Sequence, residues 1–81
     1  MTIDKRFFRA VVGARIRSLR TLQGMDQCRL AAATGIDASK LSKMENGSYS
    51  IDSVDAVKVG EILGVSLDEL LAVPEGPEHA A

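Results

Sequence analysis

The sequence predicts a small all-α domain built from five helices. Apolar residues recur at spacings of three and four along most of the chain, which is the helical period. Asp or Ser precedes each apolar segment where it can cap a helix, and glycine follows four of the segments. No segment alternates like a half-buried strand, and no internal repeat is present. The 81 residues, 46% of them hydrophobic, suffice for one small core.

The first helix is predicted from about Lys5 to Leu22, with Asp4 or Thr2 as its N-cap and Gly24 at its end. Its apolar side consists of Phe8, Val12, Ile16 and Leu19, widened by Phe7, Val11 and Leu22. Four arginines share an adjoining side: Arg6, Arg9, Arg17 and Arg20. The helix therefore has a core side next to a basic side.

Two short helices that meet at a tight turn are predicted next. Asp26 can cap the first, over about 27–34, and Asp37 can cap the second, over about 38–46. Gly35 lies in the turn, where the backbone often needs a positive φ that favours glycine. A helix pair of this kind is the helix-turn-helix, whose second helix lies in the major groove of DNA.

The second helix of this pair is expected to have an inner and an outer side. Leu41 and Met44, three residues apart, should point into the core. The opposite side is small and polar, with Lys40 on its flank, and consists of Ala38, Ser39, Ser42, Lys43 and Asn46. We therefore expect an exposed polar surface on a helix that apolar residues anchor from within.

Two further helices follow a short loop. Asp52 can cap a helix that ends near Leu63 and is stopped by Gly64. Ser66 and Glu69 have the spacing of a capping box, which would begin a short fifth helix. The residues expected to face the core are Val54, Val57 and Ile62 in the fourth helix and Leu67, Leu70 and Leu71 in the fifth.

Residues 74–81 contain two prolines and a glycine, so we expect a flexible C-terminal tail after a domain that spans residues 1–73. The net charge of −1 hides an asymmetry between the two halves of the chain. Residues 1–43 hold nine basic and three acidic side chains, a charge of +6; residues 44–81 hold one and eight, a charge of −7. A basic front favours a nucleic-acid partner, although an ordinary charged surface distributed unevenly along the chain is the alternative.

The composition argues against several other classes of protein. A single cysteine, Cys28, excludes an internal disulfide and fits a reducing cytosol, so we expect a cytoplasmic protein. One His and one Cys far apart make a zinc site improbable, and we expect no metal and no cofactor. No segment has the length and hydropathy of a membrane span or signal peptide. An enzyme is the least favoured class, because no carboxylate pair, nucleophile triad or phosphate loop is present.

Five short motifs occur in register over about residues 8–72. They are Arg15-Ile16-Arg17-x-Leu19-Arg20, Gly24-Met25-x-Gln27-x-x-Leu30-Ala31, Gly35-Ile36, Glu45-Asn46-Gly47 and Leu63-Gly64-Val65-Ser66-x-x-x-Leu70-Leu71. With these motifs the chain resembles the phage-repressor/Cro-like (XRE-type) helix-turn-helix family. The resemblance implies a lambda-repressor-like fold and sequence-specific binding to double-stranded DNA, usually as a homodimer on a palindromic site, in transcription regulation.

The resemblance also implies roles for individual residues. Base-reading positions are matched by Ala38, Ser39, Lys40 and Lys43, with Ser42 on the same side. Gln27 matches a position that contacts a phosphate or the outer base of a half-site, and Asn46 one that contacts the DNA backbone. Arg17 and Arg9 are phosphate candidates, and Tyr49 offers a hydroxyl to phosphate. Each has a plainer alternative: the basic residues can form a solvated surface, Gln27 can be an ordinary first helical residue, and Asn46 can be only a C-cap. Arg20 and Glu45 match a pair that relatives join in a largely buried, structural salt bridge.

Three departures from the family pattern affect these expectations. Thr34 lies where an apolar turn residue is usual, so the turn is expected to pack slightly differently. The loop Ser48-Tyr49-Ser50-Ile51 lacks the usual cations, which suggests weaker non-specific binding. Asp37 adds a negative charge at the start of the recognition helix, where it is either a pure cap or an acceptor for cytosine N4.

The sequence thus favours a repressor or autoregulator whose third helix enters the major groove. The alternative is a module with the same fold that binds another, unidentified protein and does not act through DNA. A homodimer would be expected to use apolar residues near the fourth and fifth helices, or at the first helix: Ile51, Val54, Leu67, Phe7 and Val11 are the candidates, each equally well explained as monomer core.

Overall fold

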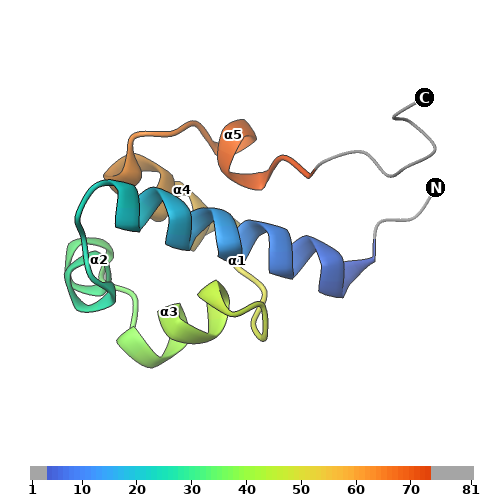
Figure 1. Ribbon diagram of the computed structural model, residues 1–81, viewed down its shortest axis with the longest axis horizontal. Coiled ribbons are helices and arrows are strands. Elements are labelled where there is room, and N and C mark those ends of the chain that lie inside the picture. Colours follow the sequence, from blue (N-terminus) through green and yellow to red (C-terminus); the bar gives the residue numbers. More distant parts are fainter. Residues whose placement is uncertain (1–3, 74–81) are drawn as a thin grey trace.

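The structure, a computed structural model, describes residues 4–73 and folds them into five α-helices without a strand (Figure 1). The helices are α1 (Lys5–Leu22), α2 (Gln27–Thr34), α3 (Ala38–Glu45), α4 (Ser53–Leu63) and α5 (Leu67–Leu71). Each has the bounds expected from the sequence to within about a residue; α3 ends at Glu45, with Asn46 as its C-cap. The predicted tail, residues 74–81, and the alternative cap Thr2 lie outside the described residues.

Local signals in the sequence account for where the helices begin and end. The N-cap side chains of Asp4, Asp26, Asp37, Asp52 and Ser66 each accept a hydrogen bond from a backbone N–H in the first turn of their helix. At the turn between α2 and α3, Gly35 has a φ of 76°, a left-handed conformation that a residue with a Cβ rarely adopts. These caps satisfy backbone groups that helix ends leave unpaired.

One hydrophobic core joins all five helices. Figure 1 shows α1 crossing the middle of the molecule, with α3 below it and α5 above it in this view. The buried apolar residues are Val12, Ile16, Leu30, Ala31, Ile36, Leu41, Met44, Ala56, Val59, Leu63 and Leu70. None of the helices in the described part of the chain is long and apolar enough to cross a membrane.

The inner faces predicted for α4 and α5 were partly wrong. The following residues were expected inside but are exposed: Val54, Val57, Ile62 and Leu67, together with Phe7 and Leu22 of α1. In α4 the buried positions are instead Ala56, Val59, Gly60 and Leu63. Gly60 is buried where the backbone of the segment after α4 comes close to the helix: a Cβ on Gly60 would lie 2.9 Å from the carbonyl oxygen of Val65. Because small residues occupy part of the inner face of α4, larger apolar residues lie on its outer face. A prediction that places the largest and most apolar residues inside therefore assigns the faces the wrong way round.

A still closer approach sets the distance between α1 and α3. A Cβ on Gly13, in the middle of α1, would lie 2.2 Å from the carbonyl oxygen of Met44 and 2.7 Å from that of Glu45. Glycine in a helix interior costs about 1 kcal/mol relative to alanine. Here the absence of a side chain lets the C-terminal turn of α3 rest directly on α1.

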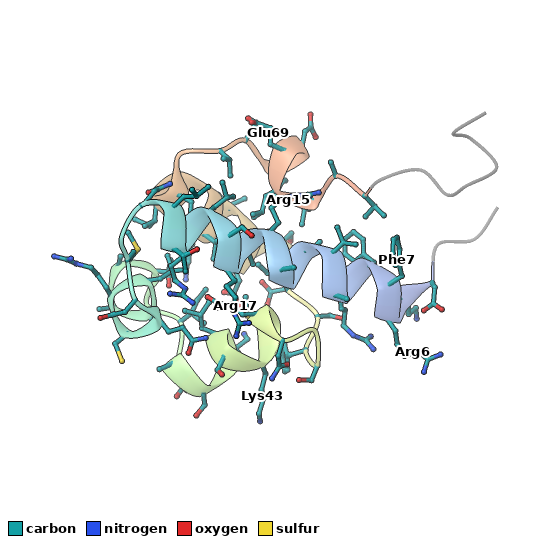
Figure 2. All side chains as sticks on the ribbon, viewed as in Figure 1. Arg6, Phe7, Arg15, Arg17, Lys43 and Glu69 are labelled. Carbon is teal, nitrogen blue, oxygen red and sulfur yellow. The ribbon has the colours of Figure 1, made fainter. Side chains whose placement is uncertain are left out.

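Arg15 fastens the C-terminal end of α5 to α1. Its guanidinium donates hydrogen bonds to the carbonyl oxygens of Glu69 (3.2 Å), Leu70 (3.0 Å) and Ala72. Figure 2 shows Arg15 directed from α1 toward α5. Cations favour the C-terminal end of a helix because its last carbonyls carry partial negative charge. This arginine therefore helps to hold a helix of five residues that is too short to be stable alone.

Candidate nucleic-acid interface

The third helix presents a polar face to solvent at the edge of the molecule. Ala38, Ser39, Lys43 and Asn46 are exposed, and Ser42 is half-buried. On the opposite side Leu41 and Met44 are 0% and 2% exposed. Figure 2 shows Lys43 pointing away from the body of the molecule. An exposed polar surface is thus fixed in place by buried apolar anchors.

Basic side chains from α1 lie on the same side as this surface. Arg17 and Arg6 both point toward the α3 side of α1 in Figure 2. The Arg17 side chain is 60% exposed, and its Nε lies 3.7 Å from Glu45 Oε1, so the guanidinium retains donors that face solvent. Arg17 and Lys43 together give this side of the molecule a positive field.

Glu45 connects the first three helices. Arg20 of α1 donates to both of its carboxylate oxygens, from Nε and Nη2 at 2.8 Å each. Gln27 of α2 donates from Nε2 to Oε1 at 3.0 Å. Arg20 also donates to the Met25 carbonyl at 2.8 Å, in the segment between α1 and α2. Because Arg20 and Glu45 are 8% and 3% exposed, this is a buried bidentate ion pair that sets the orientation of α3.

The environment favours the charged form of both partners. Burial by itself would raise the pKa of Glu45, but the hydrogen bonds from Arg20 and Gln27 and the charges of Arg20 and Arg17 hold it below its ordinary value. The hydrogen bond to Glu45 raises the pKa of Arg20, against the opposing effect of burial. The pair therefore stays ionised at neutral pH.

Gln27 turns its amide nitrogen inward to Glu45, so its side chain is partly engaged within the protein. It is half-buried and is the first residue of α2, where a backbone N–H has no partner within the helix. Any contact with a phosphate would thus use this backbone N–H or the second N–H of the Nε2 amide group, since a phosphate oxygen only accepts. The sequence alone gave no sign that Gln27 joins the ion-pair network.

The loop after α3 is held by polar contacts. Asn46 accepts hydrogen bonds from the backbone N–H of Ser48, at 3.0 Å, and from its hydroxyl. Arg9, a phosphate candidate from the sequence, donates from Nε to the Gly47 carbonyl at 3.2 Å. Tyr49 is 45% exposed, and its ring lies beside Lys40 of α3. Arg9 therefore supports the loop from α1, and the polar groups of the loop lie next to the α3 surface.

Lys40 does not share the outer surface of α3. Its ammonium lies 2.8 Å from Oδ2 of Asp55, at the start of α4, and 5.4 Å from the centroid of the Tyr49 ring. Asp55 is 7% exposed. Sequence reasoning missed Asp55, because an acidic residue in the first turn of a helix is expected to be exposed there. The pair links α3 to α4.

The two remaining departures have local explanations. The buried Thr34 hydroxyl donates to the Leu30 carbonyl at 2.8 Å and accepts from the Ile36 N–H at 3.3 Å, so a polar residue fits the turn. The Asp37 carboxylate is exposed and accepts from the Ser39 N–H at 2.7 Å, as a cap does. The described residues contain no group of His, Cys, Asp and Glu that could hold a metal ion, and Cys28 is exposed.

A sequence profile of the helix-turn-helix family matches residues 16–70, from the middle of α1 into α5. The chain belongs to the helix-turn-helix family. Over 67 residues this helix-turn-helix chain is 31% identical to the HTH-type transcriptional regulators PuuR of Escherichia coli (strain K12) and Shigella flexneri. The match covers 83% of this chain and 36% of each relative, so the chain spans about a third of the length of these curated relatives.

Solved structures of regulators are also similar to this helix-turn-helix domain. The restriction-modification controller protein C.AhdI from Aeromonas hydrophila is 32% identical, with a TM-score of 0.73 over 76% of this chain and 94% of that one. The clp gene regulator ClgR from Corynebacterium glutamicum is 31% identical, with a TM-score of 0.75 over 79% and 68%. The hypothetical transcription factor NHTF from Neisseria is 28% identical, with a TM-score of 0.78 over 95% and 83%.

These matches confirm the family and the five-helix, lambda-repressor-like fold expected from the sequence. The proteins that match are named as transcriptional regulators, a gene regulator and a controller protein, so the similarity supports a DNA-binding regulator.

Proposed function

We propose that this helix-turn-helix domain acts as a repressor or autoregulator of transcription by inserting α3 into the major groove of a specific DNA site. The observation that carries the proposal is the division of α3 into two sides. Leu41 and Met44 are buried, while Ser39 and Lys43 face solvent next to the basic side of α1. Contact with chromosomal or phage DNA would place the protein in the cytoplasm.

The proposed contacts divide into those that read bases and those that position the domain. Lys43 donates to guanine O6 or N7, Ser39 bonds either kind of base edge, and Ala38 contacts a thymine methyl group. The phosphate contacts come from Arg17, Gln27, Asn46 and Tyr49, with Ser42 at the margin of the reading surface. Lys40 is left out of this set because its ammonium is paired with Asp55.

Substitution of Lys43 should differ in kind from substitution of Arg17. We expect Lys43→Ala to relax base preference at one position of the site, by about 1–3 kcal/mol. Arg17→Ala should weaken binding to all sequences about equally and reduce the slope of log K against log salt by about 0.9. The measurement is selection of bound oligonucleotides from a random pool, followed by titration of the selected and scrambled duplexes.

Lys58→Ala is the matched control, because it removes the same charge from an exposed position on α4. It should leave base preference unchanged. An equal loss of affinity for selected and scrambled DNA in Lys43→Ala would remove Lys43 from the base-reading set.

We further propose that two copies bind a palindromic operator through apolar residues that the monomer leaves uncovered. Val54, Val57 and Leu67 are 61%, 43% and 39% exposed. Ile51 and Val11, also considered from the sequence, are half-buried and have less surface to offer a partner. A second copy would remove the apolar α4 surface from water, which favours association.

Val54→Asp is expected to shift the protein toward monomer, because a carboxylate would be desolvated in the interface. Affinity for a two-half-site duplex should fall while affinity for a single half-site stays constant. Sedimentation velocity and titration of both duplexes provide the measurements, with Glu61→Ala, an exposed position of the same helix, as control. A wild-type protein that sediments as a monomer both free and on the two-half-site duplex would contradict the dimer.

The alternative, a module that binds another protein in place of DNA, predicts a different response to salt. Binding of DNA should weaken linearly in log K against log salt. A protein that ignores every duplex at low ionic strength would favour the alternative.

A further inference from the structure

The ion pair between Lys40 of α3 and Asp55 of α4 has no part in the proposed function. Asp55 belongs to the first turn of α4, and its backbone N–H donates to the Asp52 cap at 2.8 Å. Its Oδ2 is inaccessible to solvent and has no well-aligned hydrogen bond among the described residues. The Lys40 ammonium, 2.8 Å away, is therefore the group that balances the charge of this oxygen.

Lys40 is held in place from two sides. Its side chain is 31% exposed, and its ammonium lies over the Tyr49 ring, 5.4 Å from the centroid. The close contact with the Asp55 carboxylate raises the pKa of Lys40 above its ordinary value, against the opposing effect of burial. The ammonium thus faces the carboxylates of Asp55 and of the N-cap Asp52, together with the Tyr49 ring. It points away from the outer surface of α3.

Moving Lys40 to a phosphate would leave Asp55 behind as a buried, unbalanced carboxylate. Removal of one partner from a buried ion pair is unfavourable because the other charge loses both its partner and its solvent. A lysine that stays with its partner releases no counterion from DNA, and so adds nothing to the salt-dependent part of binding.

We propose that Asp55 limits the sequence-independent affinity of the domain for DNA by withholding Lys40 from the phosphates. Asp55 is thus a positioning residue that acts through Lys40, although it lies on another helix and is buried. This inference rests on the proposed DNA binding. It gives a role to the ion pair between a cation of α3 and a buried carboxylate of α4.

Two variants test the proposal. Asp55→Asn keeps the shape of the side chain and removes the charge that holds Lys40. Lys40→Met/Asp55→Asn removes both charges and keeps an unbranched side chain at position 40. The probe is a random-sequence 20-base-pair duplex, titrated by filter binding over a series from 50 to 200 mM salt.

With Asp55→Asn, the slope of log K against log salt should become steeper by about 0.9, as expected for one additional phosphate contact. Between 200 and 50 mM salt its affinity should therefore rise about 3-fold more than that of the wild type. The double variant should return to the wild-type slope. If the pair has only a structural role, both variants should differ from the wild type in thermal stability while all three proteins have the same slope of log K against log salt. That result would overturn the proposal.

The comparison survives if Asp55→Asn does not fold. The double variant and the wild type should then have equal slopes, and a shallower slope in the double variant, by about 0.9, would show that Lys40 already contacts a phosphate. Circular dichroism melts establish which variants are folded.

A measurement without DNA separates failure of the inference from failure of the proposed function. The measurement is reductive methylation followed by mass spectrometry. In the wild type Lys40 should react more slowly than Lys43, whereas in Asp55→Asn the two lysines should react at similar rates. Equal methylation rates of Lys40 and Lys43 in the wild type would show that Asp55 does not hold Lys40, which would overturn the inference. Absence of binding to any duplex with the slow Lys40 reaction intact would instead overturn DNA binding.

Discussion

Gly13→Ala should destabilise the domain by about 3 kcal/mol, although alanine is normally the better helix former. The added Cβ would meet the backbone carbonyl oxygens of Met44 and Glu45, at 2.2 and 2.7 Å. Neither backbone group can rotate away, so α3 must move from α1 or the helix must distort. Urea denaturation followed by circular dichroism measures the loss.

Ser18→Ala is the matched control, since it places alanine at an exposed position of the same helix. Its change in the free energy of unfolding should stay within about 0.5 kcal/mol. Gly60→Ala should fall between the two, because its nearest atom, the Val65 carbonyl oxygen, is 2.9 Å away. A Gly13→Ala protein as stable as the wild type would show that α1 and α3 are not this close.

Glu45→Ala should cost about 3–5 kcal/mol, because it leaves the buried Arg20 guanidinium without its carboxylate. Gln27 loses its acceptor in the same substitution. Replacing both partners, as in Arg20→Met/Glu45→Leu, should recover much of the loss, since no lone charge then remains. Chemical denaturation of Arg20→Met, Glu45→Leu and the double variant gives the coupling energy. Additive effects would mean that the pair does not act as a unit.

The same carboxylate should make the protein sensitive to acid. The folded-state pKa of Glu45 is lower than its ordinary value of 4.5, so the ionised form stabilises the fold above that value. This contribution is lost as the pH falls from about 4.5 through the folded-state pKa. Arg20 remains charged throughout. Glu45→Gln should therefore lose less stability than the wild type between neutral and acidic pH, in unfolding measured over that range.

The sequence predicted the helices well because their ends are determined locally. Each N-cap is an Asp or Ser whose acceptor lies within three residues of its donor, and Gly35 provides the turn. The inner side of α3 was also predictable, since Leu41 and Met44 are its large apolar residues. The faces of α4 were not, because Ala56 and Gly60 are buried for their small size, and a wheel weighted by hydropathy favours Val54.

The spacing of residues along the chain could not predict contacts between residues that are distant in the sequence. The pairing of Arg20 with Glu45 was implied only by family resemblance, across 25 positions. Asp55 gave no sign of its burial, and Lys40 was expected to face DNA. From the sequence alone, Gly13 would be expected to destabilise its helix. In the structure a residue without a side chain is required there, because α3 packs directly against the α1 backbone. Tertiary contact determines the role of each.

The position of Tyr49 has a practical consequence. It is the single tyrosine of a chain without tryptophan, and its ring lies beside the Lys40 ammonium and α3. Ultraviolet emission from this protein therefore originates almost wholly from one phenol. Any event that displaces the ammonium or buries the ring will change that signal, so the chain contains an intrinsic fluorescent probe beside α3.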